Sequence, residues 1–322
     1  MLDNQPTLSC ETNCWKPESN NLPSRRTIMI GTAPTHSSIQ SEPEVLSIIT
    51  GSDCNLTCAY CCKFYSTAWT RDVANKTYNV QTQDDRFVIN TTDKVLAKLS
   101  QKELSKSKNR QLLVEEIKKM YKSPALKEVL VSGGEPFLYF DLIPMLENIP
   151  SDVKVKVWSG LGVSESRFEK LVSQLPKNVT VIISAENVGS RYEFVRHGNS
   201  WQRFRNNIKV LNDAGVKYEF MATVTNLTIF GLSDFRDYAH DTKIIYMPCS
   251  DPDFLSVSVL DPESKNKINQ HNWLPEFVKE ALEVEPTPQQ VYNLKCYIEE
   301  FASRRQLDMS IFPESFRSWI QV

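Results

Sequence analysis

The sequence lacks several features that would assign the protein to a common class. No apolar run approaches the roughly 18 residues that a membrane-spanning helix needs. The opening residues, MLDNQPTLSCETNC, carry neither the basic nor the apolar region of a secretory signal, so we expect a cytoplasmic protein without a membrane partner. The formal net charge of 322 residues is only −2, and both signs are interspersed, so nucleic acid is not an expected partner.

Histidine is also scarce, and its placement excludes one large group of catalytic sites. The four histidines are His36, His197, His240 and His271. None stands in a recognisable motif, so the sequence indicates no catalytic triad, and we interpret these side chains as surface or structural ones.

Cysteine, by contrast, is plentiful and clustered. The chain has eight cysteines, and four of them (Cys54, Cys58, Cys61 and Cys62) fall within nine residues. A disulfide framework is not expected in a cytoplasmic chain of this size, whereas clustering of this kind is typical of metal sites.

Three of these residues have a spacing that suits an iron–sulfur cluster. Cys54, Cys58 and Cys61 form a CxxxCxxC triplet just after an apolar, strand-like run at 45–49. Three thiolates so close together can hold three irons of a 4Fe–4S cluster and leave the fourth iron open to another ligand. Zinc prefers four ligands in pairs, and no second CxxC or nearby histidine completes such a site. Cysteines acting as small buried hydrophobes would not explain three in a polar loop.

The rest of the chain reads as a series of βα units. Residues 1–44 are rich in Pro, Ser, Asn and Thr, which predicts an extended or partly disordered N-terminal arm. Between 45 and 248, β-branched runs alternate with helix-compatible segments, which predicts an α/β fold with a parallel sheet, built as a partial (β/α)6 TIM-like barrel. Residues 249–322 are expected to form an α-rich C-terminal extension. The expected strands are 45–49, 128–132, 153–158, 179–184, 217–224 and 243–247, and the expected helices between them are 112–121, 139–147, 164–174, 201–213 and 231–239.

Two further regions carry local predictions. The connection 63–110 is long enough to be a lid or insertion, with an extended part from 70 to 92 and a lysine-rich helix from 94 to 110. Residues 248–272 read as loop and turn, followed by a helix at 275–283. A second C-terminal helix begins with a capping box, in which Thr287 is the N-cap and Gln290 completes the motif.

Polar motifs follow the expected strands at their C-terminal ends, where a barrel of this kind places its chemistry. The cysteine triplet follows the first strand, Gly133-Gly134-Glu135 the second, Ser159 the third, and Ser184 the fourth. We therefore expect these motifs to share one rim. The two glycines allow close backbone approach, and Glu135 offers a carboxylate to a cationic group.

The triplet and the diglycine motif together carry a family resemblance. The segment CNLTCAYC at 54–61, with GGEP at 133–136, resembles the signature of the radical S-adenosylmethionine (radical SAM) superfamily. The resemblance implies that the three cysteines hold a 4Fe–4S cluster, whose open iron chelates the amino and carboxylate groups of S-adenosylmethionine. It also implies that Tyr60 lies against the adenine and that the diglycine–glutamate motif binds the amino group.

Weaker matches complete the implied cofactor site. Ser159 and Ser184 hold positions where related enzymes place polar groups for the ribose hydroxyls and the methionine carboxylate, although serine also suits a turn after a strand. Residues 191–215 resemble a stretch of SPASM/twitch-type proteins, in which Arg196 matches a contact to the carboxylate of S-adenosylmethionine. A solvated surface arginine is the alternative interpretation. Glu186 lies two residues after Ser184 on the same rim.

The remaining cysteines leave two hypotheses open. Cys249 and Cys296 lie where SPASM and twitch proteins carry cysteines for auxiliary clusters, and Cys10 with Cys14 could complete a set of four. The alternative is a single cluster with a degenerate, twitch-like extension.

The reaction implied by the resemblance is reductive cleavage of S-adenosylmethionine to a 5′-deoxyadenosyl radical, with an electron donor such as flavodoxin or ferredoxin. The radical would abstract hydrogen from a peptide or a small-molecule substrate. One alternative is nucleotide or nucleobase chemistry, as in 7-carboxy-7-deazaguanine synthase-like proteins. An alternative from another class is a non-catalytic iron–sulfur or zinc-binding interaction module.

Overall fold

The computed structural model describes residues 43–82, 86–88 and 109–320. The expected N-terminal arm, apart from its last two residues, lies outside this part of the chain, as do Cys10, Cys14 and the lysine-rich segment 94–108. Residues from Glu44 onward form one compact unit. Within the described ranges, no helix is both long and apolar enough to cross a membrane.

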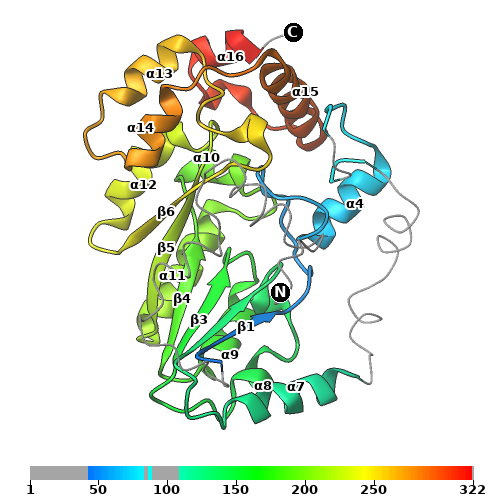
Figure 1. Ribbon diagram of the computed structural model, residues 1–322, viewed down its shortest axis with the longest axis vertical. Helices are drawn as coiled ribbons and strands as arrows, with labels where there is room; N and C mark the ends of the chain where they lie inside the picture. The colour runs from blue at the N-terminus through cyan, green and yellow to red at the C-terminus, as the bar shows by residue number, and fades with distance from the viewer. Residues whose placement is uncertain (1–42, 83–85, 89–108, 321–322) are drawn as a thin grey trace, which may run out of the picture. The chain divides into compact units, whose positions relative to one another are not determined.

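Six parallel strands form one open sheet in the order in which they occur along the chain (Figure 1). This arrangement confirms the predicted α/β fold of a partial (β/α)6 barrel. The strands are β1 (Val45–Ile49), β2 (Glu128–Ser132), β3 (Lys154–Ser159), β4 (Val179–Ser184), β5 (Lys217–Val224) and β6 (Ile244–Pro248). All five pairings are parallel, so every strand ends at the same edge of the sheet.

Helices connect the strands and continue beyond the sheet. Those between strands are α4 (Thr67–Asn75), α7 (Asn109–Met120), α8 (Leu142–Leu146), α9 (Glu165–Val172), α10 (Gly189–Val195), α11 (Trp201–Asp213) and α12 (Leu232–Ala239). After β6 come α13 (Pro262–Asn269), α14 (Glu276–Leu282), α15 (Pro288–Arg305) and α16 (Glu314–Ile320). Short 3-10 turns lie at Pro136–Leu138 (η2), Ile229–Gly231 (η3), Asp253–Leu255 (η4) and Met309–Ile311 (η5).

The two faces of the sheet have different burial. Successive side chains of a strand point to opposite faces, and one set is fully buried, for example Val131, Val157 and Val181. The opposite set is less buried, since it includes the half-buried Leu130 and Trp158, although Ile182 on the same face is buried. The helices therefore cover one face, whereas the other remains accessible for a ligand.

Two differences from the sequence prediction have a local cause. Part of the stretch expected to be extended is the helix α4, because Ser66 caps its first turn and Trp69 and Val73 form a buried stripe one turn apart. The helix α13 lies inside the region read as loop and turn. Its N-terminal signal is present in the sequence, since Asp261 accepts a hydrogen bond from the amide of Ser264. The short helices α10 and α16 were not predicted.

The long C-terminal helix α15 follows the sequence prediction closely. Thr287 and Gln290 form the predicted capping box. Leu294, Ile298 and Phe301 are buried on one face of the helix. This helix packs against α4, where the rings of Trp69 and Tyr297 stack with centroids 6.5 Å apart. The C-terminal extension thereby reaches the element that follows the cysteine triplet.

Candidate functional site

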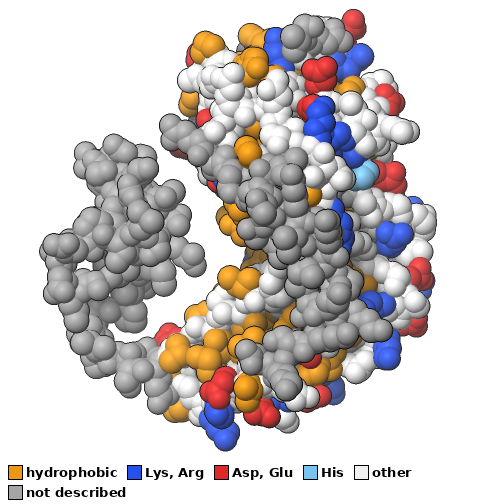
Figure 2. Space-filling view, turned by 90° about the vertical axis from the view of Figure 1, so that its right-hand side faces the viewer, with side chains coloured by type: hydrophobic (Ala, Val, Ile, Leu, Met, Phe, Trp, Pro, Cys, Tyr) orange, Lys and Arg blue, Asp and Glu red, His pale blue; other side chains and the backbone are white. Residues whose placement is uncertain are grey.

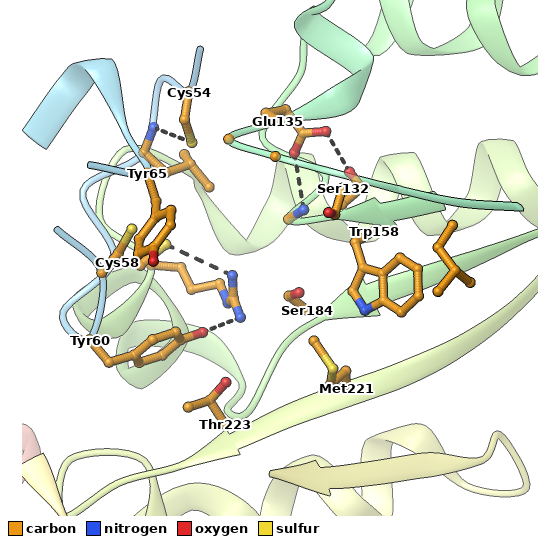
Figure 3. A pocket seen from close by; sticks show the side chains of 18 of the residues that line it. Cys54, Cys58, Tyr60, Tyr65, Ser132, Glu135, Trp158, Ser184, Met221 and Thr223 are labelled. Atoms are coloured by element: carbon orange, nitrogen blue, oxygen red, sulfur yellow. Dashed lines mark hydrogen bonds between the residues drawn. The ribbon is translucent and has the colours of Figure 1, made fainter. Parts of the chain in front are cut away.

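One cavity of about 470 Å³ is lined by every site residue that the sequence predicted (Figure 3). Those residues are Cys54, Cys58, Tyr60, Cys61, Gly133, Gly134, Glu135, Ser159, Ser184 and Arg196. They come from the loop after β1 and from the ends of β2, β3 and β4, with Arg196 directly after α10. The parallel order of the strands brings these separate motifs to one rim, as expected.

The cysteine loop has no regular secondary structure, yet its backbone is held at many points. The amides of Thr57 and Ala59 donate to the carbonyls of His197 (2.9 Å) and Val195 (2.8 Å). The Nδ1 atom of His197 also lies 2.9 Å from the hydroxyl of Thr57. His197 is therefore a structural histidine, in agreement with the sequence interpretation.

Helices α4 and α15 contact the opposite side of this loop. Trp69 Nε1 donates to the carbonyl of Cys58 (3.0 Å), and the hydroxyl of Tyr297 donates to the carbonyl of Ala59. Arg305 Nε donates to the hydroxyl of Thr57 (3.1 Å). The loop is therefore braced between the barrel and the C-terminal helix.

The three thiols suit a thiolate-ligated group in their number, state and surroundings. All three are free, and Cys54 and Cys58 are buried. Burial raises the pKa of Cys54 to about 12 and also raises the pKa values of Cys58 and Cys61. Each thiol must therefore lose a proton when it binds iron. In the described part of the chain, no three His, Cys, Asp or Glu side chains surround one point as ligands of a single ion.

The diglycine motif lets β2 end directly against the cysteine loop. A Cβ atom on Gly134 would lie 2.5 Å from the carbonyl oxygen of Asp53, and one on Gly133 would lie 2.8 Å from that of Gly51. The amides of Gly134 and Glu135 donate to the same two carbonyls at 2.8 and 2.7 Å. The sequence indicated a close backbone approach at the two glycines, and the structure shows that their backbone lies against the backbone of residues 51–53.

Glu135 connects the ends of β2 and β3. Its carboxylate accepts hydrogen bonds from Ser159 Oγ (2.8 Å), from the amide of Gly160 (3.0 Å) and from the amide of Phe137 (3.2 Å). Burial raises the pKa of Glu135, and these donors act in the opposite direction. The hydroxyl of Ser159 also accepts from the amide of Leu161 (2.9 Å). Both side chains therefore have protein partners while they line the cavity.

Glu186, to which the sequence assigned no role, is a buried carboxylate next to the cavity-lining residues Tyr60 and Arg196. It is fully buried and forms an ion pair with Arg196, with Oε1 2.5 Å from Nη2 and Oε2 3.0 Å from Nε. The hydroxyl of Tyr60 donates to the same carboxylate at 2.6 Å and also contacts the guanidinium. Arg196 Nη1 lies 3.8 Å from the sulfur of Cys58. The alternative of a solvated surface arginine is wrong, because Arg196 is only 5% exposed.

The surroundings of Arg196 keep its guanidinium charged, because they raise its pKa. Burial lowers the pKa of Arg196, but Glu186, Tyr60 and the thiol of Cys58 outweigh it and raise the pKa well above the usual value. The sequence feature that could have indicated Glu186 as a site residue was its position just after the end of a strand, in the segment SAEN. Its partner is ten residues away in sequence and reaches it only because α10 turns the chain back.

The floor of the cavity consists of side chains that the sequence reasoning did not select. Ser47, Leu130 and Trp158 line it from β1, β2 and β3, and Met221 and Thr223 line it from β5. Figure 3 shows Trp158 and Met221 pointing into the same space. On the face drawn in Figure 2, hydrophobic side chains gather in patches, whereas charges of both signs are scattered over the surface.

Comparison with known proteins places this site in a family. A family model described as the radical SAM superfamily matches residues 48–241. No curated protein matches the chain. Among solved structures, anSMEcpe with bound AdoMet is 14% identical, over 70% of this chain and 57% of that chain, with a TM-score of 0.44.

Two structures of SuiB from Streptococcus suis are also similar. The structure bound to S-adenosylmethionine is 17% identical, over 72% of this chain and 42% of that chain, with a TM-score of 0.40. The structure bound to precursor peptide SuiA is 13% identical, over 93% of this chain and 51% of that chain, with a TM-score of 0.43. The chain spans about half the length of these matched proteins.

Proposed function

The chain belongs to the radical SAM superfamily of enzymes, whose cofactors are a 4Fe–4S cluster and S-adenosylmethionine, and on that premise we propose that the cavity lined by the cysteine triplet is the active site. Cys54, Cys58 and Cys61 would hold the cluster. The observation that carries this proposal is the convergence of all ten predicted residues on one cavity. The thiols fit the group because they are free, face one space and number three, which leaves one iron for S-adenosylmethionine.

The bound cofactors would supply a 5′-deoxyadenosyl radical by one-electron cleavage of S-adenosylmethionine. The protein would hold the reactive carbon beside the substrate and exclude water. The ring of Tyr60 is fixed by Glu186 and can lie against the adenine. Arg196 lines the cavity, and its Nη1 atom lies 3.8 Å from the sulfur of Cys58, so a carboxylate of S-adenosylmethionine can be bound at this guanidinium.

The cavity floor favours an uncharged reacting group on the substrate. Glu135 and Arg196 are the charged residues among the described lining, and both already have protein partners. The remaining floor offers the indole of Trp158, the thioether of Met221 and hydroxyl groups. An aromatic or aliphatic side chain of a peptide, or a similar small molecule, suits this surface.

A nucleotide or nucleobase substrate is the second candidate within the family. A phosphate group needs a cation or several free amide donors, and the described lining offers no lysine. A bare nucleobase could still stack on Trp158. Copurified purine, rather than copurified peptide, would favour this second candidate.

The same proposal implies an electron donor and a cellular location for the enzyme. Reduction requires an electron donor such as flavodoxin or ferredoxin. All six cysteines in the described ranges are free thiols, which supports the cytoplasmic location expected from the sequence.

We also propose a core ending near 248, followed by a twitch-like extension. An auxiliary cluster remains a prediction that needs Cys10 and Cys14.

An assay for 5′-deoxyadenosine tests the proposed reaction. After anaerobic reconstitution and reduction with dithionite, the wild-type protein should convert S-adenosylmethionine into 5′-deoxyadenosine and methionine. The variant Cys58→Ala should lose this activity at least a hundredfold because one iron loses its ligand. The variant Cys62→Ala is the matched control, since Cys62 is buried beside the triplet but does not line the cavity. A loaded cluster that never cleaves S-adenosylmethionine would instead indicate a binding module.

A further inference from the structure

A second hollow, of about 370 Å³, opens beside the cysteine loop. It is lined by Cys54, Asn55, Thr67, Arg71, Leu138, Gly162, Val163, Ser164 and Arg167. Among these described residues, only Cys54 also lines the large cavity. Cys54 therefore lies between the proposed cofactor site and a separate opening at the surface.

The position of Arg71 over this hollow follows from helix geometry. Thr67 and Arg71 are four residues apart on α4 and share one face of the helix. The hydroxyl of Thr67 donates to the carbonyl of Cys54 at 3.0 Å and accepts from the amide of Cys54 at 3.2 Å. The same helix face therefore fixes Cys54 and presents Arg71, which is exposed.

Arg167 supplies a second positive charge from α9. Its Nε and Nη2 atoms donate to the carbonyls of Phe137 (3.1 Å) and Leu138 (2.9 Å), so its charge is oriented but not neutralised. Its guanidinium lies 5.4 Å from the ring centroid of Phe140, a side chain that is 52% exposed. The face thus combines oriented charge with an exposed aromatic ring.

Negative charge is missing from the lining of this hollow. Its nine described residues include two arginines and no carboxylate. Asp53 interacts electrostatically with Arg71 but does not line the hollow. Because the whole chain is slightly acidic, with a net charge of −2, a positive face here is a local feature.

We propose that this hollow is the docking face for the reductant, a small acidic one-electron carrier protein that binds over Arg71 and Arg167. This inference rests on the proposed function, because only a site that needs an electron needs such a partner. The reduced cofactor of the carrier loses one electron, which the group held by the cysteines gains, and no bond or proton is exchanged. Electron-transfer encounters are small and transient, and complementary charge mainly accelerates them, which suits two arginines around a shallow hollow.

A binding measurement tests the docking face without relying on catalysis. The probe is a purified, oxidised flavodoxin, titrated into the protein by calorimetry at low ionic strength. Arg71→Glu should raise the Kd about tenfold, because a complementary charge becomes a repulsive one. Arg71→Lys should bind like the wild type. The matched control is Lys177→Glu, which makes the same charge change on an exposed residue before β4, at the opposite end of the strands.

A kinetic measurement separates this proposal from the proposed function. Arg71→Glu should slow reduction by flavodoxin about tenfold at low salt, and the difference should shrink as salt screens the charges. Reduction by dithionite, which needs no docking face, should be unchanged. Equal effects of Arg71→Glu and Lys177→Glu on the Kd, or no effect of Arg71→Glu, would overturn the docking face. Failure of the wild type to cleave S-adenosylmethionine with dithionite would instead overturn the proposed function.

Discussion

At the scale of single residues, Glu186 determines the charge balance of the cavity wall. It is fully buried and neutralises Arg196 through two contacts, while a third hydrogen bond fixes Tyr60. A buried guanidinium without its carboxylate is costly, because the interior replaces little of the lost hydration. Glu186 thus allows a cation to lie beside the cysteine loop.

The substitution Glu186→Gln should therefore lower the free energy of unfolding by about 3 kcal/mol. Denaturant titration of the purified protein measures this change. The matched control is Glu219→Gln, which removes the same charge from an ion pair with Lys243 that is largely exposed. That control should cost less than about 1 kcal/mol. Equal losses in the two variants would contradict the role assigned to Glu186.

The site residues that could be predicted from the sequence are those that belong to a motif with a fixed local spacing. The cysteines, Gly133, Gly134 and Glu135 carry a local spacing that has meaning in sequence alone. Trp158 and Met221 carry no such spacing, because their role depends only on which face of the sheet they occupy. Glu186 was difficult for another reason: its function is defined by a partner that the fold, and not the motif, brings to it.

At the scale of secondary-structure elements, α15 supports the cysteine loop. Tyr297 and Arg305 donate hydrogen bonds to Ala59 and Thr57 on the loop, and Trp69 of α4 donates to Cys58 between them. These hydrogen bonds hold the backbone and Thr57 side chain of the loop from the side of the C-terminal helix. The sequence predicted the helix from its capping box, but nothing local indicated what the helix would touch.

The substitution Tyr297→Phe should loosen this loop. It leaves the carbonyl of Ala59 without its donor and should cost about 1–2 kcal/mol. Hydrogen exchange at the amides of the cysteine loop should become faster in the variant. Tyr121→Phe is the matched control, because it removes a similar buried hydrogen bond, to the carbonyl of Met145, elsewhere in the core. Faster exchange in the loop of both variants would show that the effect is only a general loss of stability.

At the scale of the whole molecule, the order of strands could be predicted because the pattern is repetitive. Runs rich in β-branched residues alternate with amphipathic segments, and β1, β2, β4 and β5 begin and end where the sequence predicted. The α4 region was misjudged because a polar surface hid the two apolar residues, Trp69 and Val73, that anchor it. The packing of α15 against α4 and the cysteine loop is a contact between segments far apart in sequence. No periodicity or motif in a single sequence predicts such a contact.

In the proposed active site, one rim of the sheet holds the cluster and S-adenosylmethionine together. Electron paramagnetic resonance of the reduced, reconstituted protein tests it directly, with S-adenosylmethionine whose carboxylate carries an oxygen isotope with nuclear spin. We expect hyperfine coupling between the cluster and the labelled carboxylate, because in the proposed site the iron without a cysteine ligand would bind that group. Identical spectra with labelled and unlabelled S-adenosylmethionine, at saturating concentration, would contradict the account.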